Sequence, residues 1–147
     1  MLDVNLCGLF LLSQRVANAM LDADVDSGRI VNISSVVGHV GVPAMTVYSG
    51  TKAGVYGITW GLAAELSPHG ITVNSISPGM IRVGRIENLM EEKDELYDLD
   101  RIPVGRLGDP EEIADACVFL ASNRTKYVTG EDLRVDGGVA ITAGLYR

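Results

Sequence analysis

The stretch "RIVNISSVVGHVGVPAMTVYSGTKAGVYGITWGLAAELSPHGITVNSIS", residues 29–77, predicts a strand, a loop, a long helix and a second strand. The runs "RIVNIS" (Arg29–Ser34) and "ITVNSIS" (Ile71–Ser77) are short and rich in β-branched residues, as buried strands are. The segment from about Val47 to Ser67 is rich in Ala and Gly, and "PHG" ends it as a helix. Two apolar strands joined by a helix are typical of a parallel sheet.

The flanking sequence continues this alternation. Residues Leu2 to Met20 predict a helix whose apolar positions fall largely on one side, namely Leu6, Leu9, Phe10, Val16 and Ala17. Asp109 is placed to cap a helix that starts at Pro110 and runs to about Ser122. Asp132–Val135 predicts a third strand, and a glycine turn follows it. We therefore expect an α/β fold with about three parallel strands and flanking helices.

One further segment, Arg85–Leu99, is highly charged and predicts a helix. The sequence contains no internal repeats, low-complexity segments or linker, and 147 residues suit one domain. We therefore expect residues 1–147 to form a single unit.

Composition and charge exclude several classes of function. Hydrophobic residues make up 47% of the chain and the net charge is −7, with no basic stripe, so nucleic acid is excluded as a partner. The apolar run "LCGLFLL" is too short for a membrane span and has no basic flank, which predicts a cytoplasmic protein that does not bind membranes. Two cysteines, Cys7 and Cys117, make no disulfide framework and are expected to be reduced core residues.

A tyrosine and a lysine stand four places apart in "TVYSGTKAG". On a helix Tyr48 and Lys52 share one face. An ammonium beside a phenol lowers the phenol's pKa, which would let Tyr48 give or take a proton near neutral pH. Such a pair alone is a weak signal, so its meaning depends on what surrounds it.

Three loops are expected at the carboxyl ends of the strands, where parallel sheets bind ligands. They span residues 34–46, 78–84 and 136–140. The first carries two serines and leads into Tyr48, and the second carries Pro78 and Gly79, where a flat ligand could approach the backbone. The two histidines, His39 and His69, look isolated in loops, so no metal cluster is expected. Serine hydrolase chemistry is excluded because the sequence has no Gly-x-Ser-x-Gly elbow.

Taken together, these motifs resemble the short-chain dehydrogenase/reductase family. The resemblance rests on residues 28–81, on "DVNLCGLF" before them and on "PVGRLGDPEEIADACVFLAS" and "YVTGEDLRVDGG" after them, and so covers essentially the whole chain. It implies part of a Rossmann-type doubly wound sheet, NAD or NADP as cofactor, and a small-molecule alcohol or carbonyl substrate.

The resemblance also implies roles for four residues. Tyr48 matches the family's catalytic acid/base, and Lys52 matches the lysine that lowers its pKa and binds the nicotinamide ribose. Ser35, thirteen residues before Tyr48, matches the serine that hydrogen-bonds the substrate carbonyl, and the spacing favours it over Ser34. Asn5 matches the asparagine that kinks its helix and holds a water in the proton relay.

Further positions match the segment that lies against the nicotinamide, namely Pro78, Gly79 and Ile81. Where the family often has a threonine that donates to the carboxamide, this chain has Val83, which would cost one hydrogen bond. With Tyr48 and Lys52, these residues form the expected cofactor contacts. Asp136, Gly137 and Gly138 are expected to form a structural turn.

The family's glycine-rich Thr-Gly-x-x-x-Gly-x-Gly turn and its Asn-Asn-Ala-Gly segment are absent from the 147 residues. We therefore expect the N-terminal dinucleotide-binding half, roughly 100 residues, to be missing, as in a truncated gene or a partial sequence. The residues that would distinguish NAD from NADP belong to that half. The substrate is equally open between a 3-oxoacyl thioester and a sugar or polyol.

Self-association is expected through helices 2–20 and 47–67, which form the dimer contact in the family, so the resemblance implies a homo-oligomer. The strand at 29–34 would also expose an apolar edge. Two alternatives to an enzyme remain open: a non-catalytic partner subunit of full-length relatives, and an inactive gene remnant.

Overall fold

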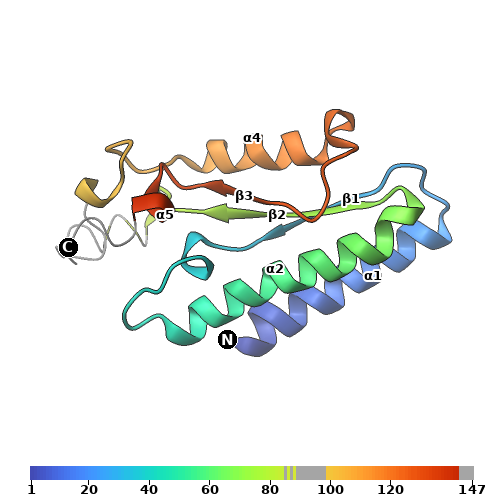
Figure 1. The fold of residues 1–147 in the computed structure, drawn as a ribbon, viewed down its shortest axis with the longest axis horizontal. Coiled ribbons are helices and arrows are strands. Elements are labelled where there is room, and N and C mark those ends of the chain that lie inside the picture. The colour runs from blue at the N-terminus through green and yellow to red at the C-terminus, as the bar shows by residue number, and fades with distance from the viewer. Residues whose placement is uncertain (85, 87, 89–98, 143–147) are drawn as a thin grey trace.

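A computed structural model describes residues 1–84, 86, 88 and 99–142. Its centre is a parallel sheet of three strands in the order β1-β2-β3 (Figure 1). These are β1 (Arg29–Ile33), β2 (Thr72–Pro78) and β3 (Asp132–Val135). The α/β prediction and the three strands are confirmed, with boundaries within one residue. The expected charged helix at 85–99 falls almost wholly outside the described residues.

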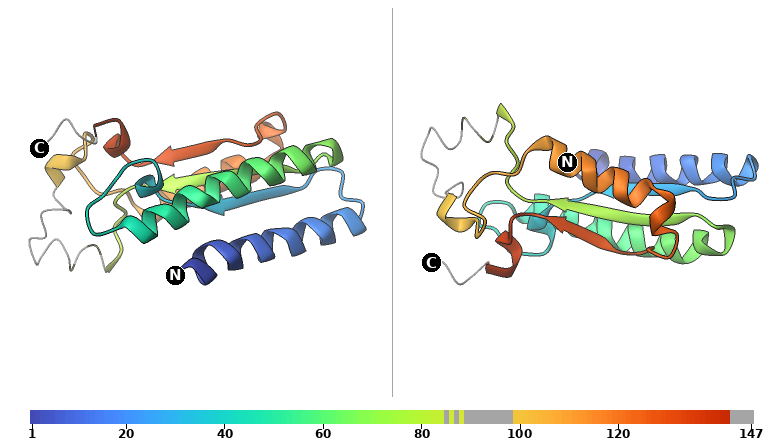
Figure 2. Two further views of the ribbon diagram at one scale, coloured as in Figure 1. Left: turned by 60° about the horizontal axis from the view of Figure 1, so that its bottom comes forward. Right: turned by 90° about the horizontal axis from the view of Figure 1, so that it is seen from above.

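Helices cover both faces of this sheet, as Figure 2 shows from two further sides. On one face lie α1 (Leu9–Asp22) and α2 (Thr46–Leu66), and on the other lies α4 (Pro110–Ala121). The short helical segments are η1 (Asp3–Gly8), η2 (Val36–Gly38), η3 (Ser67–His69), η5 (Leu99–Arg101), η6 (Asn123–Thr125) and α5 (Val139–Thr142). α2 and α4 match the ranges expected from the sequence within one residue, and the expected helix 2–20 corresponds to η1 and α1 together, which span Asp3–Asp22.

The core beneath α1 and α2 is apolar. It consists of Ala17, Ile30, Leu62, Ala63, Leu66, Ile71 and Val73. Buried polar groups next to it are paired: Ser13 of α1 donates to Asn32 of β1 at 3.1 Å, and Asn32 donates to Thr59 of α2 at 3.1 Å. These bonds fix both helices on β1, because leaving a buried polar group without its partner costs about 1–3 kcal/mol.

The first helix differs from its prediction in one respect. Ala17 is buried as expected, but Phe10 is 39% exposed and Cys7 is exposed, so the expected core position of Cys7 is wrong. Cys117 is only half-buried. The apolar pattern predicted an inner face, but within the described residues only a narrow stripe of this helix meets the sheet.

The helix Asp3–Asp22 is long and apolar enough to cross a membrane by length and composition, so the expectation that the apolar run was too short is wrong. Such a helix is weak support for a span, since core helices and signal sequences share these properties. Here it packs on α2 and β1 and donates from Ser13 to Asn32.

Asp109 caps the start of α4, as predicted, and the structure shows that this cap is a capping box with Glu112. The Asp109 amide donates to Oε2 of Glu112 at 2.8 Å, and the two carboxylate oxygens of Glu112 accept from Arg106 at 2.8 Å each. The Arg106 guanidinium and the Asp109 amide lower the pKa of Glu112 to about 2. This end of α4 therefore anchors the loop that precedes it.

Candidate active site

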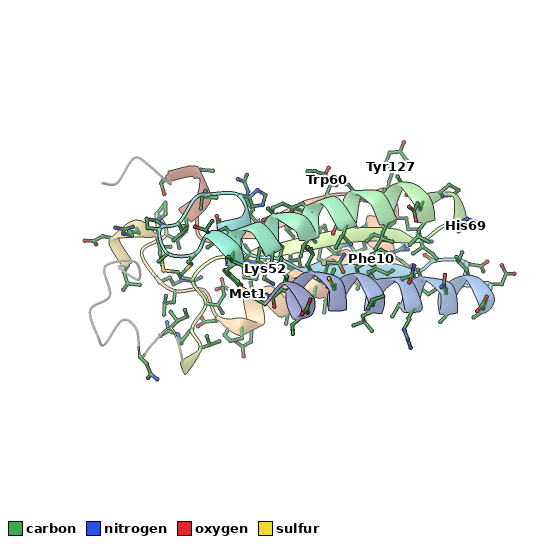
Figure 3. All side chains as sticks on the ribbon, turned by 90° about the horizontal axis from the view of Figure 1, so that it is seen from below. Met1, Phe10, Lys52, Trp60, His69 and Tyr127 are labelled. Carbon is green, nitrogen blue, oxygen red and sulfur yellow. The ribbon has the colours of Figure 1, made fainter. Side chains whose placement is uncertain are left out.

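The three loops at the carboxyl ends of the strands meet, as predicted. Ser34 donates from its backbone amide to Ile76 of β2 at 2.8 Å, and Gly79 donates in the same way to Val135 of β3 at 3.0 Å. Figure 1 shows η2, the start of α2 and α5 together at this edge, and Figure 3 places Lys52 near Met1 and far from His69. The edge therefore gathers the residues that follow the three strands and those at the start of α2, with the N-terminus of the chain nearby.

Tyr48 and Lys52 lie one turn apart on α2, with the ammonium nitrogen 5.8 Å from the centroid of the phenol ring. Lys52 also donates from Nζ to the carbonyl of Ile33, at the end of β1, at 3.0 Å. That bond holds the ammonium at the strand end and leaves it two further N–H donors. Burial lowers the pKa of Lys52.

The Tyr48 side chain is only half-buried. Among the described residues its hydroxyl makes no hydrogen bond, although Thr51 donates to its backbone carbonyl at 2.7 Å. The phenol thus stands beside a cation with its oxygen available to a ligand.

Ser34 and Ser35 differ in what their hydroxyls do. Ser34 is buried and donates from Oγ to the carbonyl of Lys52 at 2.8 Å, which ties the loop to α2. Ser35 is half-buried, caps η2, and accepts only a long bond of 3.4 Å from the Val37 amide. Of the two, Ser35 has the hydroxyl that a ligand could engage.

Asn5 lies in η1, which is π-helical rather than α-helical. Single π turns occur often at functional sites, and this one agrees with the kink implied by the family resemblance. The segment η1 packs closely on α2: a Cβ on Gly54 of α2 would lie 2.7 Å from a methyl carbon of Leu6 in η1. Asn5 therefore belongs to the same corner of the molecule as the helix that carries Tyr48 and Lys52.

The segment after β2 is fastened to the scaffold. Gly79 fits close against Asp136, because a Cβ there would lie 2.7 Å from the Asp136 Cα. Backbone packing therefore already requires a glycine here, and the expected approach of a flat ligand at Gly79 stays a prediction. Ile81 forms a bridge with Gly108, while Pro78 is half-buried and Val83 is 46% exposed.

The turn after β3 is structural, as expected. Asp136 accepts from the amides of Gly138 and Ala140 at 2.9 Å each and so begins α5. Gly137 and Gly138 have φ values of 61° and 90°, which favour glycine.

A second group of residues at this edge was missed by sequence reasoning. Tyr56 donates to the Ser35 carbonyl at 2.8 Å and lies 3.1 Å from Ser77 Oγ. His39, expected to be isolated, stacks on the Tyr56 ring at 4.4 Å and donates to Asp132 at 2.7 Å. No local motif signals this cluster, because Asp132 lies 93 residues from His39.

A groove of about 500 Å³ lies away from this edge, between α1 and α2. It is lined mainly by apolar side chains, including Phe10, Ile58 and Leu62, and extends to His69. None of the predicted site residues lines it, so we assign the candidate chemistry to the strand edge rather than to the groove.

Comparison with known proteins agrees with this geometry. A family model described as enoyl-(acyl carrier protein) reductase matches residues 1–140. A 3-oxoacyl-acyl-carrier-protein reductase, FabG, from Thermotoga maritima is 45% identical over 140 residues, which are 95% of this chain and 56% of the relative. A (3R)-3-hydroxyacyl-CoA dehydrogenase from Canis lupus familiaris is 44% identical over 137 residues, or 92% and 52% of the two chains.

Solved structures show the same fold. A candidate 2-deoxy-D-gluconate 3-dehydrogenase from Agrobacterium tumefaciens, crystallised with bound NADP, has a TM-score of 0.88 at 41% identity, over 95% of this chain and 57% of that one. A short-chain type dehydrogenase/reductase from Mycobacterium marinum has a TM-score of 0.84 at 40% identity, over 93% and 54%. The chain spans about half the length of the curated relatives it matches. By its family match, its relatives and its fold, the chain belongs to the short-chain dehydrogenase/reductase family.

Proposed function

We propose that this chain supplies the catalytic part of an NAD(P)-dependent oxidoreductase that interconverts an alcohol and a ketone. The observation that carries the proposal is the pairing of Tyr48 and Lys52 on one face of α2, at the carboxyl ends of the strands. A phenol with an available oxygen beside a fixed cation is suited to proton transfer.

The residues present fit the nicotinamide end of such a cofactor. Lys52 uses one of its three N–H donors for the Ile33 carbonyl, and the other two could donate to the hydroxyl groups of a ribose. Pro78, Gly79 and Ile81 would border the ring, with Val83 where a carboxamide contact would be made. When bound, a nicotinamide exchanges a hydride with the substrate carbon.

The chain's own residues would handle the oxygen and its proton. Ser35 would donate to the substrate oxygen and orient it, and Tyr48 would give or take the proton. Lys52 would supply the positive field, and Asn5 would hold a water that connects the site to solvent. Placing such donors in advance is usually the largest contribution to catalysis.

The remainder of the cofactor site is proposed to lie outside these 147 residues. In the family, a glycine-rich turn at a helix N-terminus receives the pyrophosphate, and the sequence has no such turn. The curated relatives are about twice as long as the matched region, which leaves room for such a part elsewhere in the whole protein.

The substrate is proposed to be a 3-oxoacyl or 3-hydroxyacyl thioester. Relatives named for those substrates support this choice over a sugar or polyol. The structural neighbour named for a deoxygluconate makes a sugar acid the alternative to test beside it.

A homo-oligomer is proposed to form through helices 2–20 and 47–67. Large apolar side chains are exposed on both helices, including Leu12 at 64% and Trp60 at 60%, and apolar side chains such as that of Ile58 line part of the groove between them. Figure 3 shows Trp60 pointing away from the body of the molecule. A second copy would cover this surface. A cytoplasmic location and a single folded unit stay predictions.

The test is a titration of the protein that carries this chain with NADH and NADPH, followed by the fluorescence of the reduced nicotinamide. Saturable binding that Lys52→Ala weakens, together with oxidation of NAD(P)H by a 3-oxoacyl thioester, supports the proposal. Binding of full-length relatives without any turnover would favour the non-catalytic subunit. A folded protein with neither property would favour the gene remnant.

A further inference from the structure

We propose that Tyr56 is a positioning residue that holds the turn carrying Ser35, through hydrogen bonds and ring stacking that join α2, β2 and β3. This inference rests on the proposed function, because Ser35 is the group that would orient the substrate oxygen. Tyr56 itself is buried and its hydroxyl is engaged by Ser35 and Ser77, so it would touch neither substrate nor cofactor.

The turn is held at both ends. At its start, the Ser35 carbonyl accepts from the Tyr56 hydroxyl at 2.8 Å and from the Gly38 amide at 3.0 Å. At its end, His39 stacks on the Tyr56 ring and donates to Asp132 Oδ2 at 2.7 Å. The short helix η2 therefore lies between two contacts to the same tyrosine.

Close packing makes this arrangement specific. A Cβ on Gly38 would lie 2.6 Å from the Tyr56 oxygen and 2.9 Å from the Ala53 amide nitrogen. Only a glycine lets the turn approach α2 so closely. Tyr56 is 6% exposed, and burial raises its pKa, so the phenol stays protonated and acts as a donor.

The acceptor at the base of the network is Asp132. Ser75 and Asp132 are register partners on neighbouring parallel strands, so their side chains share the face covered by α2. The Asp132 carboxylate accepts from Ser75 at 2.5 Å and from Ser77 at 3.0 Å, in addition to His39. Both serines are fully buried, which gives these bonds a fixed geometry.

Counting protons shows which bond matters most. Tyr56 and Ser77 have one hydroxyl proton each, but their oxygens make three contacts: to the Ser35 carbonyl, to each other and to Asp132. The Ser35 contact is the shortest at 2.8 Å, and a carbonyl can only accept, so the Tyr56 proton goes there. Ser77 then donates to Tyr56 or to Asp132, and in either case Ser75 donates a hydrogen bond to the Asp132 carboxylate.

The test compares the wild type with Tyr56→Phe in the protein that carries this chain. Tyr127→Phe is the matched control, because Tyr127 is fully exposed and undergoes the same chemical change. We expect amide hydrogen exchange at Gly38 and His39 to accelerate about tenfold in Tyr56→Phe, with exchange in α4 unchanged. Unchanged exchange at Gly38 and His39 would overturn the proposal, whatever the activity.

Turnover provides the second readout. Tyr56→Phe should lower kcat for ketone reduction about tenfold, and in a Ser35→Ala background it should change kcat less than twofold. An equal tenfold loss in that background would show that Tyr56 does not act through Ser35, and would overturn the proposal. A wild type with no turnover would count against the proposed function alone, because the exchange measurement still decides the role of Tyr56.

His39 offers an independent variant if Tyr56→Phe does not fold. His39→Ala removes the donor to Asp132, whereas His39→Gln keeps an N–H that can reach the carboxylate. We expect faster exchange at Gly38 in His39→Ala and partial restoration in His39→Gln. Equal exchange in wild type and His39→Ala would contradict the second anchor of the turn.

Discussion

Two tyrosines on α2, eight residues apart, have opposite surroundings. Tyr48 is half-buried, lies beside the Lys52 ammonium, and has no hydrogen bond to its hydroxyl among the described residues. Tyr56 is buried, stacks on His39, and contacts both Ser35 and Ser77 through its hydroxyl. The same side chain is left available for a ligand in one place and fully engaged by the scaffold in the other.

This difference separates the residues that could bind a ligand from the residues that hold them in position. Residues proposed to meet substrate and cofactor keep unused donors or acceptors, as Ser35 and Lys52 also do. Behind them, Tyr56, Ser75 and Ser77 are hydrogen-bonded to the scaffold. Preorganised sites need both layers, because a reacting group displaced by about 1 Å can cost 10²-fold in rate.

The largest expected effect comes from removing the cation beside Tyr48. Lys52→Ala should weaken binding of reduced nicotinamide and lower kcat/KM for ketone reduction by about 10³-fold or more, since field and ribose contacts are lost together. Steady-state kinetics and fluorescence titration measure the two effects. Lys126→Ala, which changes an exposed lysine, is the control. A Lys52→Ala protein with wild-type binding and turnover would remove Lys52 from the site.

Ser35→Ala should have the next largest effect, about a 10²-fold loss of kcat, because one donor to the developing charge on oxygen is removed. Cofactor binding should not change. The matched variant is Ser34→Ala, in which a buried bond to the Lys52 carbonyl is lost. Ser34→Ala should lower the melting temperature and leave kcat near the wild-type value. A large loss of kcat in Ser34→Ala with an unchanged melting temperature would assign the substrate contact to Ser34.

A substitution at Gly79, the glycine after β2, tests whether close packing holds the backbone behind the proposed site. Gly79→Ala places a methyl group 2.7 Å from the Asp136 backbone and should destabilise the fold by about 1–3 kcal/mol in urea unfolding. Gly57→Ala is the control, because a Cβ there meets nothing within 4 Å and alanine favours a helix. Equal stability of Gly79→Ala and wild type would contradict the packing role of this glycine.

The smallest expected effect is at Glu112. Its pKa is lowered to about 2 from an ordinary value of 4.5, so its charged form stabilises the fold above pH 4.5, and that contribution is lost as the pH falls toward 2. Glu112→Gln should therefore melt slightly lower than wild type at pH 7. The difference should shrink between pH 4.5 and 2. A constant difference across that range would show that the Arg106 contact is not electrostatic.

Much of the fold could be predicted because its signals are local. The runs at 29–34 and 71–77 are rich in β-branched residues, and the capping box at Asp109 and Glu112 is a four-residue pattern. Tyr48 and Lys52 could be paired in the same way, because four residues on a helix suffice to bring them together.

The parts that sequence reasoning missed depend on tertiary contacts. His39 looked isolated, since its partners Tyr56 and Asp132 are brought to it only by the crossover of α2 and the pairing of β2 with β3. The packing of Gly79 against Asp136 was missed because that contact cannot be read from the local sequence. Cys7 was placed in the core because an apolar periodicity identifies a face but not what covers it.

The most direct measurement of the central claim compares Tyr48→Phe with Tyr56→Phe for NADPH-dependent reduction of a 3-oxoacyl thioester and for thermal unfolding. We predict that Tyr48→Phe lowers kcat by about 10²–10⁴-fold with an unchanged melting temperature and unchanged nicotinamide binding. Tyr56→Phe should lower kcat only about tenfold and should also lower the melting temperature. A Tyr48→Phe protein that reduces the ketone at the wild-type rate would contradict the assignment of Tyr48 as the acid/base.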